Sequence, residues 1–182
     1  GKRPLIAIKI IEGLMGKGIP VKLEIYGSGV MKNELQEYIS TKNLDPFVKL
    51  EGNFKLDELN EVYKASHFLI LASQSEGWPK AVAEAMFFGC IPVATGVSCV
   101  PWMLNYGERG ILLTDGEKRV MRIENRGTEI GSDEKEWMEE SVGKIIELIQ
   151  DPEEMKRMSL AGQEWSQQYT LEKFESKIKK LL

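Results

Sequence analysis

Two glutamates, Glu76 and Glu84, stand on either side of an expected helix start. Glu76 lies in the loop after an apolar run, and Glu84 lies in an Ala-rich segment that begins after Pro79. Helical side chains lean toward the N-terminus of their helix, and an ionised carboxylate only accepts hydrogen bonds. We therefore expect Glu84 to reach a pair of hydroxyls beside the helix start, such as a ribose diol, and Glu76 to accept hydrogen bonds from a sugar.

The helix start itself is suited to bind an anion. Pro79 fits the first helical position, which leaves the backbone N–H groups of Lys80, Ala81 and Val82 without partners inside the helix. The helix dipole adds about half a positive charge at this end. These residues predict a site that holds a diphosphate mainly through the main chain, with Lys80 as an auxiliary cation.

The spacing of the two glutamates carries no information by itself, because the chain holds two further pairs at the same spacing. These are Glu139 with Glu147 and Glu164 with Glu172. Both lie on polar helical segments, where a solvated helix face explains them. The first pair differs in its context, since it follows an apolar strand and is followed by the exit sequence GCIPV.

Apolar runs and helical periodicities alternate along the chain and must position this site. Such alternation with short loops predicts the α/β class, with a doubly wound, Rossmann-like parallel sheet whose ligands bind at the carboxyl ends of the strands. The run 68–72 is continuously apolar, which is typical of a buried parallel strand, and we expect it to be the most buried one. Helices are expected at 4–15, 31–40, 56–65, 79–88 and 100–104, and strands at 21–25, 47–50, 68–72, 91–94 and 111–113.

The part of the chain after residue 113 is expected to be mainly helical. The polar, glycine-containing segment 114–135 fits an excursion or hairpin. C-terminal helices are expected at 137–149, 152–169 and 171–182, with Asp151 and Thr170 placed as N-caps of the last two.

The composition excludes several other classes of protein. The 182 residues, 42% hydrophobic and 29% charged, fit one sizeable globular domain over residues 1–182. The net charge of -4 offers no broad positive field, so we expect no nucleic-acid partner. Two cysteines without CxxC spacing and a single histidine indicate neither a disulfide framework nor a metal site, and we expect no metal and no cofactor. Because no apolar run approaches the length of a membrane span, we expect a cytoplasmic protein.

The sequence around the first glutamate pair, EGWPKAVAEAM followed by GCIPVAT, resembles the Glu-x7-Glu signature of retaining, nucleotide-sugar-dependent glycosyltransferases of the GT-B fold, family four. The resemblance extends over residues 2–113 and the final helices. It includes the segments KRPLIAIKII, LEIYGSGVMKNEL and VKLEGN, in the order and spacing of the C-terminal, donor-binding half of that family. It therefore implies that the chain is the nucleotide-sugar-binding domain of such an enzyme.

The resemblance also implies roles for individual residues. Glu84 would bind the donor ribose, and Glu76 would face the donor sugar as a catalytic residue. Lys2 matches a family lysine that contacts the phosphates and is the second catalytic candidate. The diphosphate would be held by Gly77, Trp78, Pro79, Lys80, Ala81 and Val82, and Gly52 and its neighbours would line the base. From the residues alone, Trp78 fits packing or a cleft wall better than a stacking platform.

The sequence departs from the family pattern at two places. Ser98-Cys99 and Trp102 stand where the family usually has a Gly-Gly pair and a glutamate, which bears on the preference for the donor sugar. The family domain also opens with a strand that carries a Gly-Arg pair, whereas this sequence begins at Gly1-Lys2. That strand is central in the usual order, so its absence would leave two neighbours unpaired. We expect either that the sheet closes across the space, that another chain fills it, or that the sequence is part of a longer protein with an N-terminal acceptor domain.

The function implied is transfer of a hexose-type sugar from a nucleoside diphosphate sugar, with UDP or GDP as the nucleotide. The acceptor would be a glycan or lipid-linked molecule in polysaccharide or glycolipid assembly, bound through the N-terminal domain, with the full-length protein associated peripherally with the inner membrane surface. We expect the chain alone to be inactive. Two alternatives stay open: a non-catalytic nucleotide-binding module, and a Rossmann-type oxidoreductase that uses Gly27-Ser28-Gly29, although Lys32 replaces the third glycine of that fingerprint.

Overall fold

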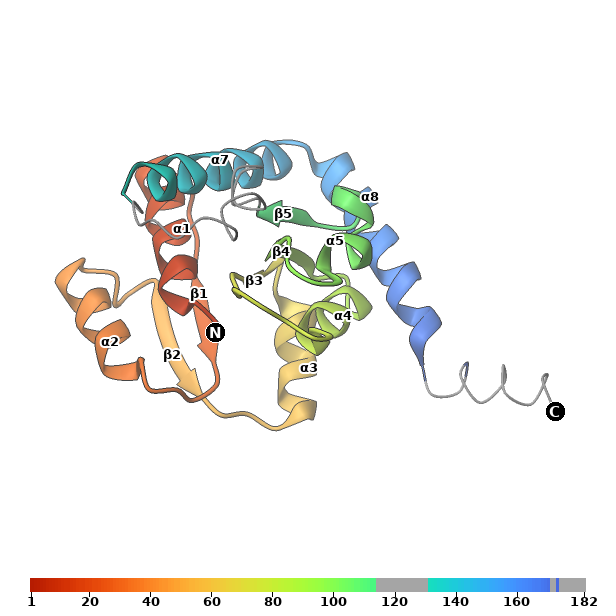
Figure 1. Cartoon of the computed structure of the whole chain (residues 1–182), viewed down its shortest axis with the longest axis horizontal. Coiled ribbons are helices and arrows are strands. Elements are labelled where there is room, and N and C mark those ends of the chain that lie inside the picture. The colour runs from red at the N-terminus through yellow and green to blue at the C-terminus, as the bar shows by residue number, and fades with distance from the viewer. Residues whose placement is uncertain (114–130, 171–172, 174–182) are drawn as a thin grey trace, which may run out of the picture.

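Strands and helices alternate along the first two thirds of the chain (Figure 1). The computed structural model describes residues 1–113, 131–170 and 173. This arrangement confirms the α/β class predicted from the sequence. The strands are β1 (Leu23–Tyr26), β2 (Val48–Gly52), β3 (Phe68–Leu71), β4 (Ile91–Thr95) and β5 (Ile111–Leu113). The helices are α1 (Pro4–Gly16), α2 (Lys32–Thr41), α3 (Leu56–Ala65), α4 (Lys80–Phe87), α5 (Val100–Met103), α7 (Gly131–Gln150) and α8 (Pro152–Ser166), with short 3-10 turns at Asn105–Gly107 and Gln167–Tyr169.

The strands form two separate parallel sheets. β1 pairs with β2, with Leu23 opposite Val48, and the second sheet has the order β3-β4-β5. Within the described ranges, β1 has β2 as its only strand neighbour and β3 has only β4. In this part of the chain, one edge of β1 and one edge of β3 are therefore unpaired, and we call the space between these two edges the sheet gap. Among the described residues the sheet does not close across this space, which was one of the three expected outcomes.

The strand β3 is less buried than its apolar sequence suggests. All four of its residues are only partly buried, whereas β4 is buried at all five positions. The prediction that 68–72 is the most buried strand is therefore wrong. The reason is position: β3 borders the sheet gap, while β4 has a strand on each side. Pro92 is tolerated within β4 because the ladder to β5 begins only at the next residue, Val93.

One hydrophobic core joins the two sheets. Helix α1 packs against both β1 and β3, and its Ile8 and Ile10 are completely buried. Each such isoleucine contributes about 1.5 to 3 kcal/mol through removal of its side chain from water. In Figure 1, α7 lies across α1 and β5, and Trp137 and Ile145 of α7 belong to the same core. The helices α1 and α7 thus hold the two sheets together where no backbone ladder does.

The opposite face of the larger sheet is covered by α4, α5 and α8. Val82 and Met86 of α4 pack with Met103 of α5 and Trp165 of α8 in a second core cluster. Helix α3 contacts the other flank of α4 through Tyr63. Coverage of both faces by helices agrees with the doubly wound arrangement.

The helix α7 begins earlier than its sequence periodicity indicates. Of the segment 114–135, expected as an excursion or hairpin, residues 114–130 lie outside the described part of the chain, and residues 131–135 form the start of α7. Thr170 accepts a hydrogen bond from the Lys173 N–H at 3.4 Å, and the helix expected over 171–182 lies outside the described residues.

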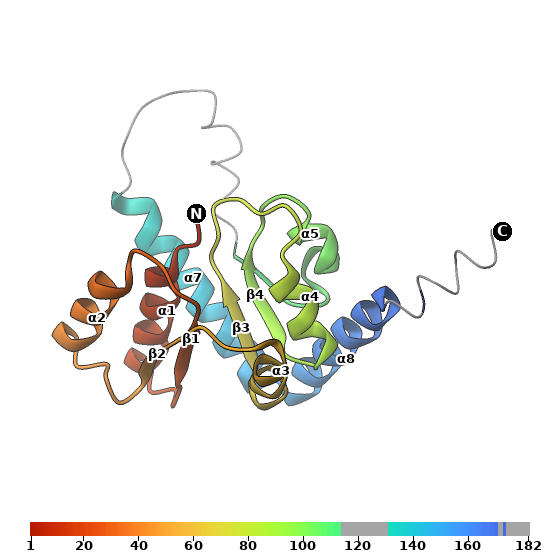
Figure 2. The ribbon, with the colours of Figure 1, turned by 90° about the horizontal axis from the view of Figure 1, so that it is seen from below.

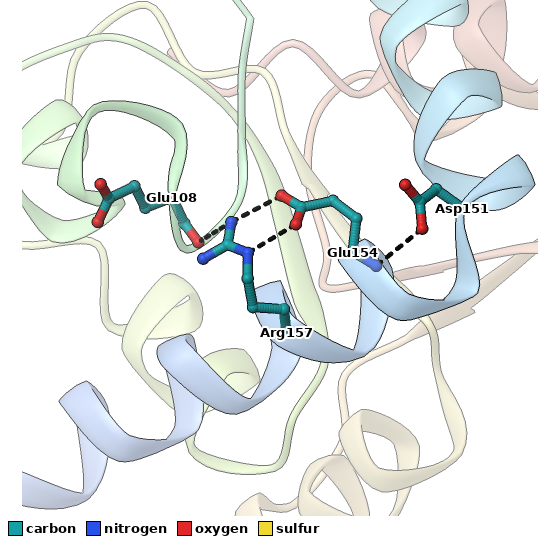
Figure 3. A network of polar contacts seen from close by, with 4 residues as sticks. All are labelled: Glu108, Asp151, Glu154 and Arg157. Atoms are coloured by element: carbon teal, nitrogen blue, oxygen red, sulfur yellow. Dashed lines mark hydrogen bonds and ion pairs between the residues drawn. The ribbon is translucent and has the colours of Figure 1, made fainter.

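The helix α8 is capped and tied to the turn before β5 (Figure 3). Asp151 is its N-cap, as predicted, and its carboxylate accepts from the Glu154 N–H at 3.0 Å. The Arg157 guanidinium donates two hydrogen bonds of 2.6 Å to the Glu154 carboxylate and one of 3.5 Å to the Glu108 carbonyl. Hydrogen bonding to Arg157 lowers the pKa of Glu154. Helix α8 itself packs against α4, the helix on which the candidate site is built.

Candidate functional site

The candidate site is built on the loop between β3 and α4, residues 72–79, which we call the signature loop. Helix α4 begins at Lys80, with Pro79 as its N-cap, so Pro79 stands one residue before the helix rather than at its first position. The Val82 N–H donates to the Pro79 carbonyl at 3.0 Å. The prediction that Val82 has a free amide is therefore wrong, because the first turn closes tightly. The amides of Lys80 and Ala81 donate to no acceptor among the described residues.

Glu76 is fixed in the signature loop by a buried serine. Its Oε1 accepts a hydrogen bond of 2.6 Å from the Ser73 hydroxyl, and Ser73 is only 1% exposed. The Ser73 carbonyl in turn accepts from the Thr95 hydroxyl at 2.5 Å, from the end of β4. The carboxylate of Glu76 is thus connected to the most buried strand of the sheet.

Glu84 lies on the flank of α4 that faces α3. Its Oε2 accepts from the Tyr63 hydroxyl at 3.3 Å. Tyr63 is buried and stacks on Phe88, with ring centroids 6.3 Å apart. Burial, together with the charge of Glu84, raises the pKa of Tyr63, so its hydroxyl stays protonated and able to donate. Glu84 therefore does not project into open solvent on the far side of the helix.

The N-terminal segment runs beside the signature loop, as Figure 2 shows for the N-terminus. The Gln74 N–H donates to the Gly1 carbonyl at 3.1 Å, and the Arg3 Nε donates to the Ala72 carbonyl at 2.8 Å. Lys2, between these two anchored residues, is exposed and makes no ion pair with any residue that the structure describes. Its ammonium group is thus available at the edge of the signature loop.

The last two predicted site residues are Gly52 and Trp78. Gly52 lies at the end of β2, on the other side of the sheet gap, where it pairs with Tyr26 in a left-handed conformation, with φ of 79°. Trp78 leaves the signature loop toward α5 and α8, and its ring lies 6.1 Å from Trp102 and 6.4 Å from Trp165. Trp78 therefore packs against other aromatic side chains, and its contact with a substrate stays a prediction.

Residues 2–136 match the family described as glycosyl transferases group 1. The chain belongs to this family. It is 25% identical over 165 residues to an uncharacterized glycosyltransferase of Methanocaldococcus jannaschii, an alignment that covers 91% of this chain and 41% of the relative.

Solved structures of glycosyltransferases have the same fold as this chain. The pneumococcal O-GlcNAc transferase GtfA, in complex with UDP and GlcNAc, superposes with a TM-score of 0.76 at 20% identity, over 99% of this chain and 32% of the other. The C-terminal domain of the group 1 family protein LpcC from Francisella tularensis superposes with a TM-score of 0.57 at 18% identity, over 87% of this chain and 91% of that domain. The chain thus has the fold of the C-terminal half of a GT-B glycosyltransferase. It spans less than half the length of the Methanocaldococcus relative and of GtfA.

The structure adds three residues for which no role in the candidate site was predicted. The Ser73 hydroxyl donates to Glu76, and the Tyr63 hydroxyl donates to Glu84. The Thr95 hydroxyl donates to the Ser73 carbonyl in the signature loop. Ser73 and Thr95 follow apolar runs directly, and a polar residue at such a position is a signal that a buried hydroxyl needs a partner. Tyr63 carries no comparable signal, because its contact depends on how α3 packs against α4. In the described part of the chain, no three His, Cys, Asp or Glu side chains lie close enough together to bind a metal ion. None of the described helices combines the length and the apolar character that a membrane span requires.

The two free cysteines are expected to react very differently with a thiol reagent. Burial raises the pKa of the Cys90 thiol to about 12, whereas Cys99 is half-buried and donates to the Gly77 carbonyl in the signature loop at 3.2 Å. At pH 8 the thiolate fraction of Cys90 is lower than that of an ordinary thiol on the order of a thousandfold. One thiol per native chain should therefore react, and two after denaturation. Cys99→Ser should abolish the native reaction, and labelling of the Cys99→Ser protein at Cys90 would contradict the buried placement.

Proposed function

We propose that this chain is the donor-binding half of a retaining glycosyltransferase that takes a hexose-type sugar from a nucleoside diphosphate sugar. The observation that carries the proposal is the start of α4, where the amides of Lys80 and Ala81 have no partner among the described residues. Apart from the chain neighbours of Gly77, no described residue has an atom within 4 Å of the place that a Cβ at this position would occupy. Open space next to free amides at a helix N-terminus suits a diphosphate.

In this proposal each signature residue has a separate task. The amides of Lys80 and Ala81 bind the diphosphate, with the side chains of Lys80 and Lys2 adding positive charge. Glu84 accepts hydrogen bonds from the ribose diol, and its location on the α3 flank next to Tyr63 supports that role. Glu76 faces the donor sugar. Gly52, across the sheet gap, borders the base, and it has open space around its Cβ position.

We take UDP as the preferred nucleotide. The solved structure of GtfA, which shares the fold over nearly the whole of this chain, contains UDP and GlcNAc. Membership of the group 1 family supports glycosyl transfer as the reaction class. UDP-GlcNAc and UDP-glucose are accordingly the first donors to test.

The proposed chemistry requires stabilisation of a leaving group. The bond between the anomeric carbon and the diphosphate breaks, and its electron pair leaves with the nucleoside diphosphate. An acceptor hydroxyl oxygen bonds to the same face of the carbon, and the proton of that hydroxyl passes to the departing diphosphate oxygen. Because negative charge grows on the diphosphate, the amides of Lys80 and Ala81 and the ammonium of Lys2 bind the transition state more strongly than the ground state. By analogy with oxyanion holes, one such donor contributes roughly 2.7 to 4 kcal/mol.

The acceptor side of the reaction belongs to the whole protein. We propose that a glycan or lipid-linked acceptor binds to an N-terminal domain, that the full-length protein associates peripherally with the inner membrane surface, and that residues upstream of Gly1 supply a strand for the sheet gap. The unpaired edges of β1 and β3 support the last point. Positioning of acceptor against donor would then come from closure of the two domains.

Calorimetry with three nucleotides tests the proposed function. UDP or GDP should bind to the purified protein, and NAD should not. Binding of NAD at the Gly27-Ser28-Gly29 turn is disfavoured because the Gly27 N–H already donates to the Gly52 carbonyl. Binding of NAD without binding of UDP or GDP would favour the oxidoreductase alternative. Transfer from UDP-GlcNAc or UDP-glucose by the full-length protein separates a transferase from a non-catalytic nucleotide-binding module.

A further inference from the structure

A chain of two buried hydroxyls connects Glu76 to the interior of the sheet. Ser73 and Thr95 are each only 1% exposed. The Thr95 hydroxyl donates to the Ser73 carbonyl at 2.5 Å, and the Ser73 hydroxyl donates to Oε1 of Glu76 at 2.6 Å. Both distances are short for O–H···O hydrogen bonds, and the second bond has an ionised acceptor, which strengthens it.

The rigidity of this connection comes from β4. Thr95 is the last residue of the fully buried strand and lies opposite Leu113 of β5 in the parallel ladder. Because Thr95 is held by that ladder, its bond fixes the backbone of Ser73, which is the second residue after β3. The Ser73 hydroxyl then holds Glu76, three residues further along, although Glu76 itself lies in a loop.

The two carboxylate oxygens of Glu76 have different surroundings. Oε1 of Glu76 is occupied by Ser73, while Oε2 makes no hydrogen bond with any residue that the structure describes. A carboxylate that is free to rotate would lose conformational entropy on binding a sugar hydroxyl, whereas one already oriented loses less. The held carboxylate therefore presents one oxygen in a defined direction.

We propose that Ser73, anchored by Thr95, is a positioning residue that orients Glu76 toward the sugar of the bound donor. The proposal rests on the proposed function, because it takes Glu76 as the residue that faces the sugar. It adds that selectivity for the sugar portion, as distinct from the nucleotide, depends on a hydroxyl at position 73. Ser75 lies in the same loop but is exposed, and it has no such role.

The test compares dissociation constants for UDP, UDP-GlcNAc and UDP-glucose by calorimetry, with the wild-type protein and with Ser73→Ala, Glu76→Gln and the double variant. The readout is the dissociation constant for UDP divided by the dissociation constant for the UDP-sugar. Ser73→Ala should lower this ratio about 3- to 10-fold for the preferred sugar and leave the UDP constant within about twofold. The double variant should resemble Glu76→Gln, because the two residues act as one unit.

Two further variants control the experiment. Ser75→Ala should leave the ratio unchanged. Thr95→Val keeps the size of the buried side chain but removes its hydroxyl. This variant should lower the ratio less than Ser73→Ala does, and it replaces Ser73→Ala as the test of the proposal if Ser73→Ala does not fold. A ratio that stays at the wild-type value in Ser73→Ala or, failing that, in Thr95→Val overturns the proposal even when UDP binds. Failure of the wild-type protein to bind either UDP or GDP would instead reject the proposed function, and the positioning role with it.

Discussion

Glu84→Gln is expected to weaken UDP binding by about 10- to 100-fold. The amide keeps the size of the side chain but removes the negative charge that would accept hydrogen bonds from the ribose diol. Hydrogen bonds to charged groups contribute about 1.5 to 3 kcal/mol, and each 1.4 kcal/mol corresponds to a tenfold change in affinity. Calorimetric titration of wild-type and variant protein with UDP measures the effect directly.

A matched substitution separates this effect from a general change of charge. Glu147 is exposed on α7 and belongs to one of the two glutamate pairs that share the same spacing without the signature context. Glu147→Gln should leave UDP affinity within about twofold. Equal losses in the two variants would remove the specific role of Glu84. Thermal unfolding of both variants should resemble that of the wild type, because Tyr63 can still donate to the amide oxygen.

Gly110→Ala is expected to destabilise the protein by about 2 to 3 kcal/mol, or roughly 4 to 12 °C in Tm. A Cβ at this position would lie 2.6 Å from the Pro92 carbonyl oxygen and 3.2 Å from the Leu104 Cδ2. The Leu104 side chain can move, but the Pro92 oxygen belongs to the backbone of the buried strand β4. Relief of the overlap therefore requires β4 or β5 to shift, and equilibrium unfolding in urea or by heat measures the loss.

A second glycine provides a control in which substitution by alanine should raise the free energy of unfolding instead of lowering it. Gly143 lies within α7, and apart from the neighbouring backbone of that helix no described atom lies within 4 Å of its Cβ position. Gly143→Ala should raise the free energy of unfolding by about 0.5 to 1 kcal/mol, because alanine loses less backbone entropy than glycine in a helix. A wild-type Tm for Gly110→Ala would show that β4 and β5 accommodate the methyl group without strain.

The local elements, and the place of the candidate site among them, were predictable from the residues. The alternation of apolar runs with helical periodicities predicted every strand and helix up to residue 113, with boundaries that differ from the structure by at most two residues. The glycine, proline and glutamate around the start of α4 indicated the site. Local rules suffice for these features because they depend on side chains that are neighbours in the sequence.

Features that depend on distant neighbours were predicted less well. The partial burial of β3 results from the unpaired edge beside the sheet gap. For Trp78 the residues favoured packing or a cleft wall, but only the structure shows that its partners are Trp102 and Trp165, which α5 and α8 bring next to α4. No periodicity records such contacts, since they join segments far apart in the chain.

The sequence by itself determined the type of each element, the parallel α/β class and the identity of the two glutamates at the start of α4, because propensity, hydrophobic period and capping act within a few residues. Only the tertiary structure decided that Ser73, Thr95 and Tyr63 hold the site and that the two sheets share one core through α1 and α7. The physical reason is that hydrogen bonds and burial are set by distances in space, and packing of α4 between α3 and α8 brings together residues that the chain keeps apart.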